Sequence, residues 1–244
     1  MASLKDICIK VRDVLFPPDI TCDLCGSEVF DGSHFCKRCA PTVTFNDGTV
    51  CPVCGRRTTR PEICIDCKAE PPIYKKGASA LVYKDGGARL VLRFKRGNPY
   101  LKDYLGRLMA QKARSLPGCD AVTYIPITKK RRRERGYNQG LLLAEAISGE
   151  LGIPVVHALT KKRDTGEQKR LTRRERAENL KGCFAIADRK GVKAKKILLA
   201  DDVLTTGATA AEACRELKIA GAAEVYLVTA ASVEWDKGVT QKRD

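Results

Sequence analysis

The chain has 244 residues, of which 43% are hydrophobic and 6% aromatic, and its formal net charge at pH 7 is +16. This length is enough for one well-buried α/β core and a small additional module. The sequence contains no run of about eighteen apolar residues, so we predict no membrane-spanning helix. Its first residues lack the apolar core of a signal peptide, and we therefore expect a cytoplasmic protein.

The positive charge is unevenly distributed along the chain. Residues 1–74 hold nine Lys and Arg against ten Asp and Glu, whereas residues 75–244 hold 36 basic against 19 acidic groups. A field of this sign attracts polyanions such as sugar phosphates, pyrophosphate or nucleic acid. We predict a cysteine-rich module in residues 1–74, which ends at the turn signal Pro71-Pro72, and an α/β domain in residues 75–244.

Eight of the twelve cysteines form four pairs with the spacing C-x2-C: Cys22 and Cys25, Cys36 and Cys39, Cys51 and Cys54, Cys64 and Cys67. In a chain that is not exported, such pairs favour metal binding over disulfides. Four thiolates hold Zn²⁺ tetrahedrally and leave no place for a catalytic water, so we predict two structural zinc sites. The spacing leaves sequential and cross-braced ligation open. His34, close to Cys36, is either an alternative ligand or a surface loop residue, and we favour the surface residue.

The first half of the α/β domain alternates strands and helices. Ala78–Tyr83 and Ala121–Ile125 read as strands, and the apolar residues from Leu101 to Met109 lie on one face of a helix between them. A further strand is expected at Val155-Val156. This alternation predicts a parallel sheet with helices on both faces. Because such sheets bind ligands beyond the carboxyl ends of their strands, the residues after Ile127 should line the binding crevice.

Two basic segments follow the strand that ends at Ile125. The first, Lys129–Gln139, contains arginines whose forked guanidinium groups match phosphate oxygens, and Gly136 permits a turn before the next helix. The second, residues 161–176, holds eight Lys and Arg. A long polar connection of this kind is either an active-site lid or an ordinary exposed helix, and the sequence leaves both open.

The run Ile197–Thr209 combines a strand, an acidic pair and the start of a helix. Residues 197–200 are apolar enough for a buried parallel strand, Asp201 and Asp202 follow it, and a helix begins after Thr205–Thr209. A helix N-terminus binds anions, and paired carboxylates suit ribose hydroxyls or hydrated Mg²⁺. The run therefore predicts a sugar-phosphate cradle. A nucleotide-binding P-loop would need a Gly-Lys pair, which the sequence does not contain.

This run resembles the motif by which type I phosphoribosyltransferases bind 5-phosphoribosyl 1-pyrophosphate (PRPP). The resemblance implies the α/β fold of that family, which here would follow the zinc-ribbon module read from the cysteine spacing, and Mg²⁺ bound together with PRPP. In that family the acidic pair, here Asp201 and Asp202, contacts the ribose hydroxyls. The loop wraps the 5′-phosphate, which implies the contacts Thr205, Thr206, Gly207, Ala208 and Thr209.

The order of motifs along the chain resembles the ComF family from residue 22 to about residue 230. The motifs are the zinc knuckles, Lys95-Arg96-Gly97, Arg131–Gln139, a segment with Gln168, Arg176, Asn179 and Phe184, and the PRPP motif. By analogy with phosphoribosyltransferases, the pyrophosphate contacts implied are Thr128, Lys129, Arg131, Arg135, Asn138 and Lys95. The analogy also implies a flexible catalytic loop that carries Gln168, Arg176 and Asn179.

ComF proteins are linked to natural transformation, which implies contact with incoming single-stranded DNA and with a ComF-type helicase. Three functions stay open at this point. The protein is an enzyme that transfers a phosphoribosyl group to an acceptor, a non-catalytic DNA-binding factor, or a PRPP-sensing regulator. The low aromatic content argues against base stacking, so DNA contact would involve the phosphate backbone. Neither the acceptor nor the oligomeric state follows from the residues.

Overall fold

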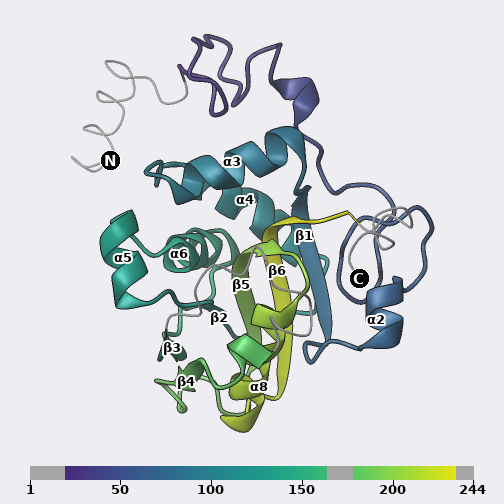
Figure 1. The fold of residues 1–244 in the computed structure, drawn as a ribbon, viewed down its shortest axis with the longest axis vertical. Coiled ribbons are helices and arrows are strands. Elements are labelled where there is room, and N and C mark those ends of the chain that lie inside the picture. The colour runs from purple at the N-terminus through teal and green to yellow at the C-terminus, as the bar shows by residue number, and fades with distance from the viewer. Residues whose placement is uncertain (1–19, 164–177, 235–244) are drawn as a thin grey trace, which may run out of the picture.

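A four-stranded parallel sheet forms the centre of the molecule. The computed structural model describes residues 20–163 and 178–234 (Figure 1). The strands lie in the order β1-β6-β5-β2, and all three pairings are parallel. Their bounds are Lys76–Val82 for β1, Ala121–Tyr124 for β2, Lys196–Leu204 for β5 and Glu224–Ser232 for β6. The predicted parallel sheet is confirmed.

Helices cover both faces of this sheet, as predicted. On one face lie α3 (Asp85–Lys95), α4 (Leu101–Ala113) and α6 (Gln139–Leu151), and on the other lies α8 (Ala208–Ile219) (Figure 1). The strand residues alternate between the two layers. Leu198 of β5 packs in the core of α4 and α6, whereas its neighbour Ile197 packs in the core of α8. Because both faces are buried, β5 reads as a continuous apolar run until its acidic pair.

The remaining elements are short. They are the 3-10 helix η1 (Ala40–Thr42), α2 (Ile65–Ala69), α5 (Lys129–Arg135), β3 (Leu159–Lys161) and β4 (Phe184–Ile186). Strands β3 and β4 form a separate antiparallel pair. The strand expected at Val155-Val156 is wrong, because Val155 makes only an isolated parallel bridge with Val122.

Irregular segments cover both outer edges of the central sheet. On the β1 side, Val82 N donates to Thr44 O at 2.9 Å and Asn46 N donates to Ala80 O at 2.9 Å, which forms an antiparallel bridge. On the β2 side, Val122 N donates to Pro154 O at 2.9 Å. Strand edges otherwise present unpaired backbone groups to any other chain, so these segments complete the sheet.

The segment that covers β1 also joins the two cysteine clusters. The first cluster, Cys22–Cys39, lies over α3 and α4, and its side chains pack into the core on that face (Figure 1). The second, Cys51–Cys67, joins the core of α8 on the opposite face. The two clusters therefore straddle the β1 edge of the sheet.

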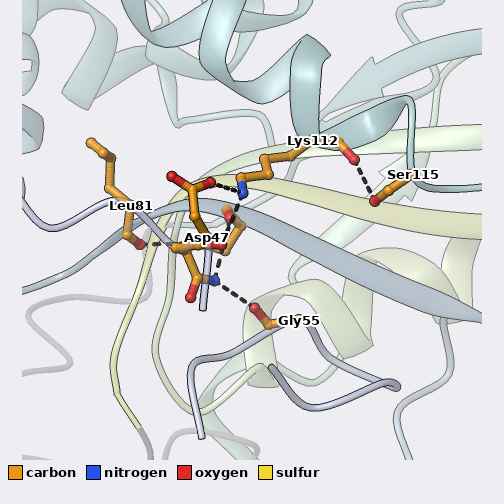
Figure 2. Close-up of polar contacts among 7 residues, drawn as sticks. Asp47, Gly55, Leu81, Lys112 and Ser115 are labelled. Carbon is orange, nitrogen blue, oxygen red and sulfur yellow. Dashed lines mark hydrogen bonds and ion pairs between the residues drawn. The ribbon is translucent and has the colours of Figure 1, made fainter. Parts of the chain in front are cut away.

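Asn46 anchors the joining segment between the second cluster and the sheet. Its side chain is only 3% exposed, and Nδ2 donates to Gly55 O at 2.7 Å and to Ser79 O at 3.3 Å (Figure 2). Lys112 of α4 donates to Asn46 O at 2.8 Å and pairs with the carboxylate of Asp47. One buried amide thus connects a cysteine cluster, β1 and the linking segment.

We expect Asn46→Ala to lower the free energy of unfolding by about 2 kcal/mol, because two buried carbonyls lose their donor. Denaturation in urea measures this change. Asp47→Ala is the matched control, since it alters the same segment but removes only an exposed ion pair with Lys112, which should change stability by about 0.5 kcal/mol or less. Equal losses in the two variants would show that Asn46 is not an anchor.

Candidate functional site

An acidic pair stands at the carboxyl edge of the central sheet. Asp201 and Asp202 lie inside the β5 ladder, which runs past the predicted end at Ala200 to Leu204. The pair is half-buried. Asp202 N donates to Asp201 Oδ1 at 2.8 Å, and Nζ of Lys95, the last residue of α3, lies 2.8 Å from Asp202 Oδ1. Two segments that the sequence analysis singled out therefore meet here.

The charges of this cluster are strongly coupled. Burial and the neighbouring Asp202 carboxylate raise the pKa of Asp201 to about 7, although Lys95 acts in the opposite direction. Burial alone would lower the pKa of Lys95, but Asp202 and Asp201 raise it above its usual value. Near neutral pH Asp201 therefore exists in both its neutral and its charged form, beside the ammonium group of Lys95.

The loop after β5 has the geometry of an anion cradle. Gly207 is in the left-handed conformation with φ 84° and is the N-cap residue of α8. Within the described residues, the backbone N–H groups of Thr206 and Gly207 donate to no protein acceptor. The first turn of any α-helix adds further unpaired N–H groups at the same point. A phosphate group satisfies such donors.

The basic segment after β2 forms a short helix, α5, beyond the same edge of the sheet. Thr128 is its N-cap residue and accepts from Arg131 N at 3.3 Å, and Gly136 ends it with φ 81°. Lys129 is exposed and Arg135 is half-exposed. Because β2 and β5 run parallel, α5 follows the sheet edge at which the acidic pair lies.

Tyr137 ties this basic segment to the Lys95 loop. Its hydroxyl donates to Phe94 O and accepts from Gly97 N at 3.2 Å. The next residue, Asn138, is the N-cap of α6, and its side chain accepts from Leu141 N at 3.4 Å. Asn138 thus has a structural role that the sequence analysis did not assign. Its contact with pyrophosphate stays a prediction, as do those of Thr128, Lys129, Arg131, Arg135 and Lys95.

The expected catalytic loop falls largely outside the described residues, which include neither Gln168 nor Arg176. Asn179 is described, and it lies half-buried just before the buried Leu180. Arg56, a residue of the second cysteine cluster that was not among the predicted site residues, donates to Thr205 O in the loop after β5. The two residues are 149 positions apart, so the local sequence around Arg56 gives no signal for this contact.

The eight cysteines form two separate tetrads, and each tetrad contains consecutive pairs. Within each, all four Sγ atoms lie within 4.8 Å of one another, with Cys25 and Cys36 at 3.8 Å and Cys54 and Cys64 at 3.7 Å. Four sulfurs at the Zn–S bond length of about 2.3 Å form a tetrahedron with edges of about 3.8 Å. The tetrads therefore fit structural zinc with sequential ligation, which resolves the alternative that the spacing left open.

His34 is not a member of the first tetrad. Its Nδ1 lies 3.0 Å from Asp23 Oδ2, and its ring packs against that of Tyr104 of α4 in a tilted arrangement, with the centroids 3.9 Å apart. This histidine therefore attaches the first cysteine cluster to the helical layer.

Comparison with known proteins assigns both parts of the chain. A double zinc ribbon domain matches residues 11–68, and a phosphoribosyl transferase domain matches residues 137–244. The chain is 32% identical over 207 residues to DNA utilization protein YhgH of Salmonella typhi. The matched region covers 80% of this chain and 89% of that protein. The chain belongs to the ComF family.

Two further members of the ComF family are similar in the same way. Competence protein F of Haemophilus influenzae is 30% identical over 173 residues, which covers 67% of this chain and 76% of that protein. Competence protein ComFC of Bacillus subtilis is 28% identical over 183 residues, which covers 71% and 73%. The predicted fold, a type I phosphoribosyltransferase sheet preceded by a double zinc ribbon, is therefore confirmed. Among the described residues, no helix is long and apolar enough to cross a membrane.

We expect the purified ComF-family protein to contain two zinc ions per chain, measurable by atomic emission. Cys54→Ser should reduce this to about one, because three thiolates and a hydroxyl hold zinc less well than four thiolates. Cys119→Ser is the control, since Cys119 belongs to neither tetrad and should leave two ions bound. Retention of both ions in Cys54→Ser would contradict the assignment of this cysteine as a ligand.

A second expectation concerns Asp201 and pH. The folded pKa of about 7 exceeds the value of an unfolded aspartate, so the folded chain binds more protons between these two values. Stability due to Asp201 therefore falls as the pH rises from about 4 to 7. Asp201→Asn, which stays neutral, should raise the free energy of unfolding by about 2 kcal/mol at pH 8, and the gain should vanish near pH 4.

Urea titrations at the two pH values measure this effect. The matched variant Asp202→Asn should destabilise the protein at pH 8, because it leaves Lys95 without its carboxylate partner. The proton assignment is wrong if Asp201→Asn is the less stable protein at pH 8.

Proposed function

We propose that this protein binds Mg·PRPP at the carboxyl edge of its sheet and transfers the phosphoribosyl group to an acceptor. One observation carries the proposal. The carboxylates of Asp201 and Asp202 directly precede a loop with unpaired amides at the start of α8. Acceptors for ribose hydroxyls are therefore followed along the chain by donors for a phosphate, and this order suits a ribose 5-phosphate.

Each group of residues has a proposed role. Asp201 and Asp202 bind the ribose hydroxyls, and the loop from Thr205 to Thr209 binds the 5′-phosphate. Cationic and polar groups beside the pair bind pyrophosphate: Lys95, Thr128, Lys129, Arg131, Arg135 and Asn138. Bound Mg²⁺ supplies positive charge to the pyrophosphate oxygens, and the acidic pair is a suitable hard-oxygen partner for its hydration shell.

The proposed reaction breaks the bond between C1 of the ribose and the pyrophosphate oxygen and forms a bond from C1 to a nucleophile of the acceptor. Positive charge develops on the ribose ring and negative charge on the leaving pyrophosphate. Lys95 and the arginines near α5 stabilise the second charge. The segment with Gln168, Arg176 and Asn179 is the proposed catalytic loop.

The names of the relatives suggest a place for this activity. They are called DNA utilization and competence proteins, and we propose that this protein acts in the cytoplasm during DNA uptake, beside a ComF-type helicase. Residues 1–74 are the proposed zinc module and residues 75–244 the proposed catalytic domain.

A second candidate function is non-catalytic binding of single-stranded DNA or sensing of PRPP. Helix α5 favours the former, because Lys129, Lys130, Arg132 and Arg133 are all exposed on one short helix. Only 6% of the residues are aromatic, so the contact proposed is with backbone phosphates rather than stacked bases.

Calorimetric titration with PRPP, with and without Mg²⁺, tests the main proposal. The double variant Asp201→Asn/Asp202→Asn should lose about a hundredfold in PRPP affinity, because it removes both charged acceptors. Release of pyrophosphate, followed over a panel of bases, nucleosides and oligonucleotides, then identifies the acceptor. Unchanged PRPP affinity in the folded double variant rejects the ribose site, and PRPP binding without any pyrophosphate release favours the sensing regulator.

The DNA hypothesis has its own test. Arg132→Ala/Arg133→Ala should flatten the dependence of single-stranded DNA affinity on salt by about 1.4 logarithmic units, at about 0.7 per lost contact. Arg107→Ala/Arg114→Ala on α4 and its C-cap is the control, because these exposed arginines lie on another helix. An equal change in both variants means that DNA does not select α5. Displacement of DNA by saturating Mg·PRPP shows that the two ligands share the crevice.

A further inference from the structure

The second zinc ribbon reaches into the phosphate loop through one arginine. Arg56 follows Cys54 and Gly55, and it is only 4% exposed. Its Nη2 donates to Thr205 O, and its Nη1 donates to Asp66 Oδ2 at 2.6 Å. Thr205 is the first residue of the loop, 149 positions further along the chain. A buried cation of the ribbon thus holds the start of the proposed phosphate site.

The planarity of the peptide bond gives this contact a directional consequence. In a trans peptide, the C=O of Thr205 and the N–H of Thr206 point in opposite directions from one rigid plane. When the guanidinium fixes Thr205 O on the ribbon side, it also directs Thr206 N–H away from the ribbon. That N–H and the N–H of Gly207 are the loop donors that have no protein acceptor among the described residues.

The guanidinium of Arg56 also lies close to Gly207 in the same loop. A Cβ atom built on Gly207 would lie 3.9 Å from Arg56 Nη2, so the arginine is close to the residue that begins α8. A planar fork can hold Thr205 O and the Asp66 carboxylate at once, and this fixes its orientation. A lysine offers one nitrogen at this place and holds the two acceptors less rigidly.

Both ends of this clamp depend on the second cysteine tetrad. Arg56 stands two residues after Cys54, and Asp66 lies between Cys64 and Cys67 in α2. Arg56 and Asp66 therefore belong to the two knuckles that the tetrad brings together. The metal that this tetrad fits therefore sets the separation between Arg56 and Asp66, and through them the position of Thr205.

We propose that Arg56 is a positioning residue, which orients the loop amides for the 5′-phosphate, and that the second zinc ribbon keeps the loop in this shape. The inference rests on the proposed function, because it takes the loop as the phosphate site. It assigns a part in ligand binding to the second ribbon and makes no such assignment to the first.

The first test separates positioning from general stability. Ribose 5-phosphate and inorganic pyrophosphate are titrated separately into the whole protein. Arg56→Ala should lower the affinity for ribose 5-phosphate by about tenfold or more and change the affinity for pyrophosphate by less than about twofold. Only ribose 5-phosphate carries the phosphate that the loop is proposed to bind. Arg56→Lys should recover part of the loss. Arg57→Ala is the control. The side chain of Arg57, next to Arg56 in the chain, pairs with Glu234, so its removal should change neither affinity. Equal losses for both ligands in Arg56→Ala overturn the proposal.

The second test needs no ligand and therefore stands if the proposed function fails. Hydrogen–deuterium exchange of a peptide covering residues 203–210 should accelerate in Arg56→Ala, whereas a peptide covering residues 121–127 should be unchanged. Asp66→Asn, which keeps the arginine but weakens its clamp, should give the same pattern to a smaller degree and replaces Arg56→Ala if that variant does not fold. Unchanged exchange of the loop in these variants contradicts positioning.

The ribbon itself is tested by the same measurement. Cys54→Ser, in the second tetrad, should accelerate exchange of the loop as Arg56→Ala does. Cys36→Ser, in the first tetrad, should lose one zinc ion and leave loop exchange unchanged. If the two cysteine variants affect the loop equally, the coupling is a general loss of stability and not a property of the second ribbon.

Discussion

The close contact between two glycines decides how the zinc ribbon meets the sheet. Gly55 of the ribbon has φ 72°, and a Cβ atom on it would lie 2.5 Å from Gly77 O of β1. Only glycine permits this approach, and Gly77 N donates to Val53 O at 2.8 Å across the same contact. The residue that follows Gly55 is Arg56, so the contact between the two backbones places the guanidinium against Thr205 of the proposed phosphate loop. A larger residue at either position would move the ribbon outward and separate these two parts.

The partial burial of Asp201 and Asp202 at the carboxyl edge of the sheet lowers the stability of the folded protein. Asp201 and Asp202 are acidic groups side by side, and the positive charges of Lys95 and Lys161 oppose theirs. A carboxyl group whose pKa is raised to about 7 weakens the folded state at neutral pH. In the proposed ribose site, a bound cation or hydroxyl group would reduce this destabilisation. The pair lies in the carboxyl-terminal half of β5, where the hydrogen-bonded backbone of the sheet holds it in place.

Sequence alone predicts the parts of this structure whose signals are local. The strand, acidic pair and helix start from Ile197 to Thr209 lie within one continuous segment, and the C-x2-C spacing defines each zinc knuckle. Contacts between distant segments have no such signal. Neither the arginine at position 56 nor the ring of His34 against Tyr104 follows from its neighbours in the chain, because each depends on how the ribbons dock. Val155 is a further example. Two adjacent valines favour a strand, but in the sheet Val155 forms only an isolated bridge with Val122.

The antiparallel bridge between Phe45 and Leu81 has a consequence for the chain without metal. The segment that contains Phe45 lies between the two cysteine tetrads in the chain. If the ribbons unfold, this segment can separate from β1 and leave the hydrogen-bonding groups at that strand edge without partners. An uncovered parallel sheet recruits strands from other molecules. Metal bound at the tetrads would therefore also keep the edge of β1 covered, in addition to holding each ribbon together.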